Sequence, residues 1–198
     1  MRFAVSLFLL VPVVLRADDK PNTLSAKEVE EGWILLFDGD TTFGWKTSGD
    51  SVVRDGSLHL GGAKEASLTT TSAFQFYELR FEYRLSGKKR AAVRAFGKAT
   101  ELVDFDNDPK WTRAEIKAAL NADGKATTSF SFEAEKMGVG GAGAAALDAD
   151  PVHLIAFTTT AESTLVVRNV RLKPIGAKSL FNGKDLSGWK IFDDPKRG

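Results

Sequence analysis

The sequence predicts an all-β fold, an antiparallel β-sandwich with a short N-terminal helix. The clearest sign is the stretch 77–85, where large apolar residues alternate with charged ones: Tyr77, Leu79, Phe81, Tyr83 and Leu85 against Glu78, Arg80, Glu82 and Arg84. This period of two is typical of a strand with one buried and one solvated face, which suits an antiparallel sheet. From residue 51 onwards, short apolar segments also alternate with turn residues.

Length, net charge and the absence of cysteine exclude several classes of function. With 198 residues, 43% of them hydrophobic, the chain can bury the core of one sizeable domain. A net charge of +1 without a long basic run gives no reason to expect a nucleic-acid partner or an anionic membrane surface. The absence of cysteine excludes disulfides, thiolate metal sites and a cysteine nucleophile.

The first residues read as a signal peptide. Met1-Arg2 is a short positive segment, Phe3 to Leu15 is apolar, and Leu15-Arg16-Ala17 is a small-residue cleavage site. We therefore expect residues 1–17 to be removed and the protein to be exported, to a periplasm, a cell envelope or the medium. The apolar run is too short for a good transmembrane helix, and we expect no membrane span in the mature chain. An uncleaved signal anchor is the alternative.

A short helix and a hairpin are expected next. Ser25-Ala26-Lys27-Glu28 is a capping box, and Gly32 is placed to end the helix that follows. Leu35 to Phe37 then predicts a strand, Asp38-Gly39 a tight turn, and Gly44-Trp45 the return of a large ring beside that strand. We interpret this stretch as a hairpin whose tryptophan packs in the core.

The same motif occurs a second time. Leu36-Phe37-Asp38-Gly39 and Gly44-Trp45-Lys46 are matched by Leu180-Phe181-Asn182-Gly183 and Gly188-Trp189-Lys190, at an offset of 144 residues. This spacing predicts an internal repeat. We expect one complete domain at 18–176 and the truncated start of a second copy at 177–198.

Further strands follow from the pattern of apolar and turn residues. Ser51–Arg54 and Ser57–Leu60 flank Asp55-Gly56 and predict a hairpin, and later strands are expected at 91–96, 127–133, 152–158 and 164–172. Residues 112–120 suit either a strand or a helix. Residues 138–146 are almost all glycine and alanine, so we expect a mobile loop over the sheet.

Few of the usual catalytic groups are available. The two histidines, His59 and His153, both fall in expected strands, and we interpret them as structural. Neither a serine-histidine-aspartate triad, a histidine-rich zinc site nor a phosphate loop is indicated. The charged face of 77–85 is read as cross-strand pairing without a further role.

An acidic run is the main candidate site. Glu101, Asp104, Asp106 and Asp108 lie within eight residues, and such carboxylates need solvent, a cation or raised pKa values. With Glu115, the three aspartates occupy positions 1, 3, 5 and 12 of a calcium loop, although Pro109 stands where that loop needs glycine. A hydrated acidic loop is the alternative. Trp111 could stack on a sugar or pack in the core.

Several segments resemble the 3-keto-disaccharide hydrolase domain family. They are the first copy of the repeated motif, Val53-Arg54-Asp55-Gly56-Ser57-Leu58, residues 76–85, and Val167-Arg168-Asn169-Val170-Arg171-Leu172-Lys173-Pro174. The resemblance implies a jelly-roll, concanavalin A-like sandwich, in which 112–120 is a strand. It also implies cleavage of 3-keto-glycosides.

The resemblance further implies roles for individual residues. Glu101 and Asp106 match the acidic positions of the family's Glu-x-Gln-x-x-Asp strand, while Val103 stands where glutamine is expected. Glu101 would be the base, Arg94 the electrostatic stabiliser, and Asp106 a metal ligand or proton donor. In this chemistry a divalent metal could replace the arginine as the electrophile. The spacing of Asp104, Asp106 and Asp108 makes them the candidate ligands of such a metal, calcium or manganese.

Three hypotheses for function therefore stand. The first is an exported hydrolase or lyase that cleaves 3-keto-glycosides by proton abstraction next to the ketone and elimination. The second is a carbohydrate-binding sandwich without catalysis, and the third is a structural module of a larger envelope protein. Turnover of a 3-keto sugar separates the first from the others, and sugar binding separates the second from the third.

Overall fold

The chain folds as a two-layer β-sandwich. The computed structural model describes residues 20–104, 110–120, 126–134, 138–146 and 152–176, together with 184, 185 and 187. Its elements in chain order are α1 (Ala26–Glu30), β1 (Ile34–Leu35), β2 (Trp45–Gly49), β3 (Ser51–Arg54), β4 (Ser57–Gly62), β5 (Ala66–Thr70), β6 (Tyr77–Gly87), β7 (Ala91–Ala95), β8 (Lys98–Leu102), β9 (Thr112–Leu120), β10 (Ala126–Ala134), β11 (Gly138–Ala146), β12 (Ala156–Thr159) and β13 (Ser163–Pro174).

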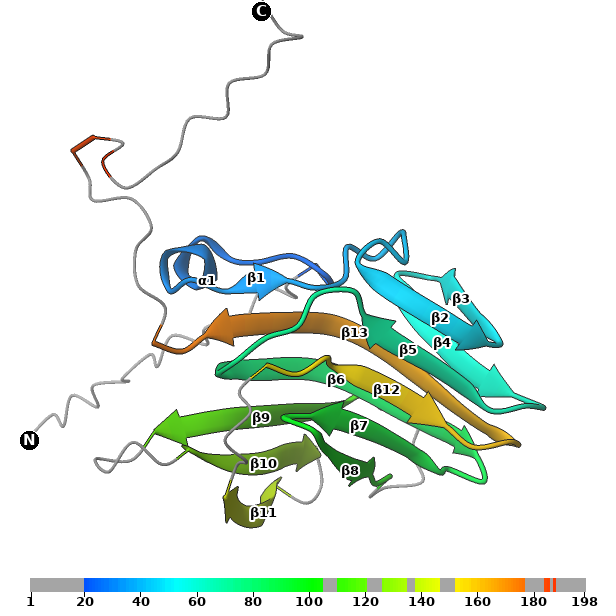
Figure 1. Ribbon diagram of the computed structural model, residues 1–198. Coiled ribbons are helices and arrows are strands. Elements are labelled where there is room, and N and C mark those ends of the chain that lie inside the picture. Colours follow the sequence, from blue (N-terminus) through cyan, green and yellow to red (C-terminus); the bar gives the residue numbers. More distant parts are fainter. Residues whose placement is uncertain are drawn as a thin grey trace, which may run out of the picture.

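Two antiparallel sheets form the layers (Figure 1). The larger has eight strands in the order β11-β10-β9-β6-β13-β4-β3, with β1 also paired to β13. The smaller has five strands in the order β2-β5-β12-β7-β8. Every described strand pair is antiparallel, as the alternating pattern predicted.

The core lies between the sheets and is rich in aromatic rings. The apolar face of β6 is buried as expected, with Tyr77, Phe81 and Tyr83 each at most 2% exposed. The Phe157 ring of the smaller sheet packs edge-on against Phe81, with 5.0 Å between ring centroids, and lies 5.9 Å from Trp45. Aromatic packing of this kind joins the two layers.

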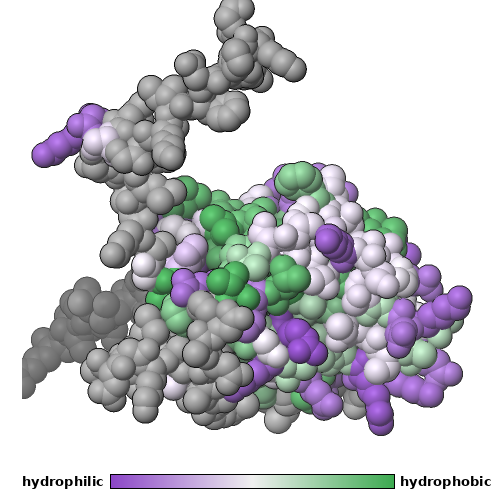
Figure 2. All heavy atoms as spheres, in the orientation of Figure 1, coloured by the Kyte–Doolittle hydropathy of each residue, from purple (hydrophilic) through white to green (hydrophobic). Residues whose placement is uncertain are grey.

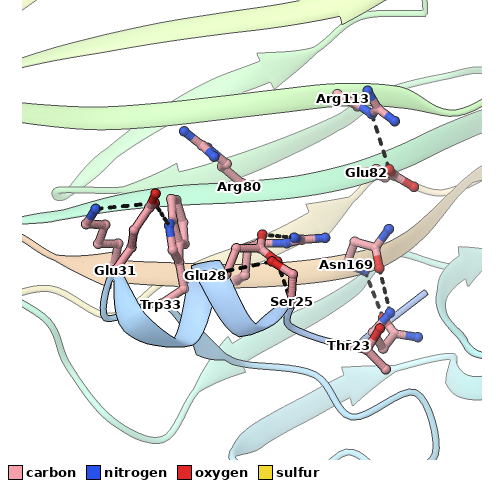
Figure 3. A network of polar contacts seen from close by, with 12 residues as sticks. Thr23, Ser25, Glu28, Glu31, Trp33, Arg80, Glu82, Arg113 and Asn169 are labelled. Carbon is pink, nitrogen blue, oxygen red and sulfur yellow. Dashed lines mark hydrogen bonds and ion pairs between the residues drawn. The ribbon is translucent and has the colours of Figure 1, made fainter. Parts of the chain in front are cut away.

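The N-terminal helix begins as predicted. Ser25 Oγ accepts from the Glu28 backbone N–H, and Glu28 Oε2 accepts from the Ser25 N–H at 2.9 Å. Gly32 follows the helix with φ of 84°. The helix lies against the outer face of the larger sheet, where Glu28 pairs with Arg171 of β13 (Figure 3). Here α1 adds a small third layer.

The stretch after the helix is not a hairpin, although its tryptophan behaves as predicted. The β1 strand pairs with β13 of the larger sheet and β2 with β5 of the smaller one, so the chain crosses between layers here. Trp45 is 6% exposed, and its Nε1–H donates to the Leu36 carbonyl at 2.6 Å. The Trp45 side chain therefore reaches back to the residue after β1, while the backbones of β1 and β2 do not pair with each other.

Of two further predictions, the hairpin after residue 51 is correct and the loop at 138–146 is not. The hairpin of β3 and β4 is confirmed, with positive φ at Asp55 and Gly56. Residues 138–146, by contrast, were wrongly predicted as a loop, because they form β11 at the edge of the larger sheet. This strand pairs antiparallel with β10, from Gly138 opposite Ala134 to Ala146 opposite Thr127.

The predicted signal peptide lies outside the described residues, as does nearly all of the expected second copy. The signal, the repeat and the boundaries of the domain therefore stay predictions. Within the described residues, no helix is long and apolar enough to cross a bilayer.

Candidate functional site

The β7–β8 hairpin carries two of the predicted site residues, Arg94 and Glu101. Its two-residue turn is Phe96-Gly97, and both residues have positive φ, 51° and 73°. A turn of this kind matches the twist of paired strands, and glycine at its second position costs no strain. The hairpin forms one edge of the smaller sheet.

Register places both side chains on the same face. Arg94 lies opposite Ala99 and Glu101 opposite Ala92, so the two are diagonal neighbours, about 7 Å apart at their Cβ atoms. Both are exposed on the outer face of the smaller sheet, away from the core. Arg94 Nη1 donates to the Gly97 carbonyl at 3.2 Å, which holds the guanidinium near the tip of the hairpin.

Two tyrosines of β6 anchor this hairpin from inside the sandwich. Tyr83 Oη donates to the Val103 carbonyl, just past β8, at 2.8 Å. At the other end, Tyr77 Oη accepts from the Phe96 N–H at 3.4 Å. Burial raises the pKa of Tyr83 to about 12 and that of Tyr77 further. Both phenols therefore stay protonated over the usual pH range, and the hairpin is held at both ends.

The rest of this outer face is covered by small side chains. Two rows of residues cross the sheet: Lys46, Thr69, Ala156, Arg94 and Ala99 in one, and Ser48, Ser67, Thr158, Ala92 and Glu101 in the other. Figure 2 shows a near-white, weakly polar surface over β2, β5 and β12. Apart from Lys46 at the β2 edge, the side chains between that edge and β7 are small, and Arg94 and Glu101 lie at the other end of the rows.

The predicted metal residues are only partly described. Asp104 is an ion-pair partner of Lys89, with 2.6 Å between Nζ and the carboxylate, whereas Asp106 and Asp108 lie outside the described ranges. Glu115, the last position of the calcium-loop alternative, lies on β9 and accepts from Arg80 Nε at 2.8 Å. Among the described residues, no three histidine or acidic side chains are grouped to hold a metal ion.

Trp111 does not join Arg94 and Glu101. It precedes β9 of the larger sheet, and its ring contacts two guanidiniums of that sheet's outer face, Arg84 at 3.9 Å and Arg168 at 4.0 Å. Burial and the neighbouring Arg168 lower the pKa of Arg84. The tryptophan is thus engaged in cation–π contacts on the opposite side of the sandwich.

The two histidines occupy different surroundings. His59 lies in β4, as predicted, and lines an open hollow of about 450 Å³ with Arg54, whose Nη2 contacts its Nδ1 at 3.3 Å. Burial and Arg54 lower the pKa of His59. His153 lies before β12, in an isolated bridge with Phe74, and not within a strand. Its ring packs beside Gly97, a proximity that sequence spacing could not reveal.

The comparisons agree with this architecture. The profile of a family described as a 3-keto-alpha-glucoside-1,2-lyase-like domain matches residues 32–146, more than half of the chain. Among curated proteins, none matches.

The similar solved structures are distant in sequence. The exoplasmic/lumenal domain of VIP36, in a form with Ca²⁺ and Man3GlcNAc bound, has a TM-score of 0.50 and 11% identity over 81% of this chain and 95% of that one. A protein provisionally assigned as a glycosyl hydrolase, from Parabacteroides distasonis, has a TM-score of 0.45 and 11% identity over 66% of this chain and 99% of that one.

Proposed function

Because the chain belongs to the 3-keto-alpha-glucoside-1,2-lyase-like domain family, we propose that it cleaves 3-keto-glycosides on the outer face of its smaller sheet. The observation that supports this site is the pair Arg94 and Glu101. They are diagonal neighbours on an exposed face, and neither has an ion-pair partner among the described residues. One carboxylate and one cation that are not neutralised by an ion pair with a described residue are the groups that this chemistry requires.

The ketone at C3 sets the order of events. It acidifies the hydrogen on C2, which the Glu101 carboxylate removes as a general base. The electron pair moves onto the C3 oxygen, and the Arg94 guanidinium stabilises the enolate that forms. When the enolate collapses, a C1–C2 double bond forms and the bond from C1 to the glycosidic oxygen breaks. Water then adds at C1, so the overall result is hydrolysis.

Of the three predicted metal ligands, Asp104 is paired with Lys89, while Asp106 and Asp108 lie outside the described ranges. Arg94 supplies the positive charge that a divalent ion would otherwise bring to the C3 oxygen.

A turnover assay tests the proposal. The full chain is incubated with a 3-keto-glucoside, with manganese in one arm and a chelator in the other, and release of the aglycone is measured. Glu101→Gln should lower kcat about 10²- to 10⁴-fold, the usual range for losing a general base. Glu30→Gln, a matched change at an exposed glutamate of α1, should leave kcat unchanged.

A carbohydrate-binding domain without catalysis is the second candidate. It is favoured by Val103, which is 46% exposed at the position where the family strand is expected to carry glutamine. Sugar binding that survives Glu101→Gln, in a chain that shows no turnover in any arm, would select this candidate. The absence of both binding and turnover would leave a structural module.

The setting of this activity also remains a proposal. The apolar segment Phe3 to Leu15 and the small-residue site at Ala17 support export to a periplasm, a cell envelope or the medium. Detection of a mature chain beginning at Asp18, outside the cytoplasm, would test it.

A further inference from the structure

The proposed reaction needs a third group besides Glu101 and Arg94. When the bond from C1 to the glycosidic oxygen breaks, the departing oxygen carries negative charge unless a proton reaches it. A general acid close to the C1 oxygen removes this cost, and histidine is the side chain most often used for such transfers near neutral pH. Only His59 and His153 can supply an imidazole in this chain.

His153 lies at the tip of the hairpin that carries the site. Its backbone is fixed by two hydrogen bonds of 2.9 Å with Phe74, one in each direction. Its imidazole is packed so closely on Gly97 that a Cβ at that position would lie 3.2 Å from Cε1 and 3.3 Å from Nδ1. The side chain is partly exposed, and neither ring nitrogen has a hydrogen-bond partner among the described residues.

Arg94 contacts the same glycine. Its Nη1 donates to the Gly97 carbonyl, so the guanidinium and the imidazole both lie beside one residue. Glu101 is the diagonal neighbour of Arg94, about 7 Å away at the Cβ atoms. The cation therefore lies between the base on β8 and the imidazole beside the turn.

This arrangement matches the geometry of the substrate. In a 3-keto-glycoside, C2 lies between C1 and C3, and each of these two carbons bears one of the reacting oxygens. The oxygens on C1 and C3 are therefore each only two bonds from C2, so the base, the cation and the acid must lie close to one another. The C3 oxygen needs the fixed cation, and the C1 oxygen needs a proton.

We propose that His153 is the general acid that protonates the leaving glycosidic oxygen, a role that rests on the proposed function. Glu101 takes the C2 proton, the C1–O bond breaks, and the imidazolium of His153 gives its proton to the departing alcohol. In the hydration step the neutral imidazole takes a proton from the water that adds to C1. Glu101 returns its proton to C2, so both groups regain their starting forms.

The other histidine provides a matched control. His59 lies in β4 of the larger sheet, lines a hollow away from the β7–β8 hairpin, and already contacts Arg54 through Nδ1. A His59→Gln change removes the same chemical group from the opposite outer face. It should not affect turnover of any 3-keto-glycoside.

The test compares two leaving groups. A 4-nitrophenyl 3-keto-glucoside releases a stable anion that needs no proton, whereas a methyl 3-keto-glucoside releases a strongly basic alkoxide that does. His153→Gln should lower kcat/KM for the methyl glycoside about 10²- to 10³-fold and leave the nitrophenyl glycoside within about 3-fold. Turnover of the nitrophenyl glycoside also proves that the variant is folded, and His153→Asn should repeat the split.

The outcomes separate the two proposals. Equal losses on both substrates would overturn the role of His153, because they would mean that the imidazole only supports Gly97. A leaving-group split produced by Asp106→Asn and not by His153→Gln would overturn it in favour of the aspartate. Absence of turnover by the unmodified chain on either substrate would overturn the proposed function itself.

Discussion

On the outer face of the larger sheet, Glu82 lies between two arginines, Arg168 at 2.8 Å and Arg113 at 3.4 Å (Figure 3 shows the second pair). On the outer face of the smaller sheet, Arg94 and Glu101 have no such partners among the described residues. The first face uses its charges in ladders across strands, where each one stabilises its neighbour. The second face leaves Arg94 and Glu101 without ion pairs to described residues, so the number of charged residues on a face does not by itself distinguish the two faces.

The largest expected effect comes from the layer that separates the two faces. Phe157 is fully buried and touches rings from both sheets. Phe157→Ala should lower the free energy of unfolding by about 3–5 kcal/mol through lost burial and the cavity left behind. Chemical denaturation measures this, with Phe157→Leu as the milder control. A loss below about 1 kcal/mol would mean that the sheets do not share this core.

Substitutions in the charged ladder around Glu82 should lower the free energy of unfolding by less than Phe157→Ala does. Glu82 has a side chain only 12% exposed. Glu82→Gln should cost about 2 kcal/mol of stability, because it removes charged hydrogen bonds and leaves arginines unneutralised. Glu133→Gln, at a carboxylate that is 58% exposed, should cost under about 0.5 kcal/mol. Turnover per folded molecule should not change in either variant, and a drop in Glu82→Gln would connect the two faces.

Tyr83 connects β6 in the core to the end of β8 in the smaller sheet. Removing its hydroxyl should destabilise the fold less than Glu82→Gln does. Tyr83→Phe removes the hydrogen bond to the Val103 carbonyl and should cost about 1 kcal/mol. Since this bond holds the end of β8, kcat should fall modestly while the fold persists. Unchanged stability and activity would show that the hairpin is held by its backbone ladder alone.

The same residue predicts a response to alkaline pH. Tyr83 has an ordinary pKa near 10 when unfolded and about 12 when folded, so the folded state favours the protonated phenol. Its contribution is complete below pH 10 and is lost as the pH rises toward 12. Unfolding midpoints measured between pH 9 and 12 should therefore fall less steeply for Tyr83→Phe. Identical slopes in the two proteins would contradict the assignment.

The smallest expected effect on stability belongs to Glu101. Because Glu101 is exposed and lacks an ion-pair partner among the described residues, Glu101→Gln should change the unfolding free energy by less than about 0.5 kcal/mol. This is the sharpest form of the comparison: the residue that matters most for turnover should matter least for folding. A destabilisation of 2 kcal/mol would place Glu101 with Glu82 as a structural group.

The elements that sequence predicted well carry strong local signals. The alternation from Tyr77 to Leu85 predicted β6, and the Ser25–Glu28 pattern predicted the helix cap. By contrast, β2 and β5 were missed because residues such as Lys46, Ser67 and Thr69 show no clear apolar period. Residues 138–146 were missed because a segment of almost only glycine and alanine shows no such period, although it pairs with β10.

In the candidate site, too, local relations could be predicted from the sequence and long-range contacts could not. Arg94 and Glu101 fall on one face, as their assignment to one site requires, because a single hairpin carries both. Trp111 was grouped with them by proximity in sequence, but it lies opposite Arg84 of β6 in the other sheet. His153 was interpreted as structural because it fell in an expected strand, and its proximity to Gly97, more than fifty positions away, was not visible in the sequence. Such contacts depend on sheet topology, which residue patterns do not specify.

The place of β13 in the larger sheet has a consequence for synthesis on the ribosome. This last strand of the domain lies between β6 and β4 and also pairs with β1. Until residues 163–167 have emerged, the strand that joins β4 to β6 in the larger sheet is missing from the nascent chain. The reciprocal backbone-to-side-chain bonds between Asn22 and Asn169 can likewise form only once Asn169 has emerged. Translation must therefore run almost to the end of the domain before its first residues find their final neighbours.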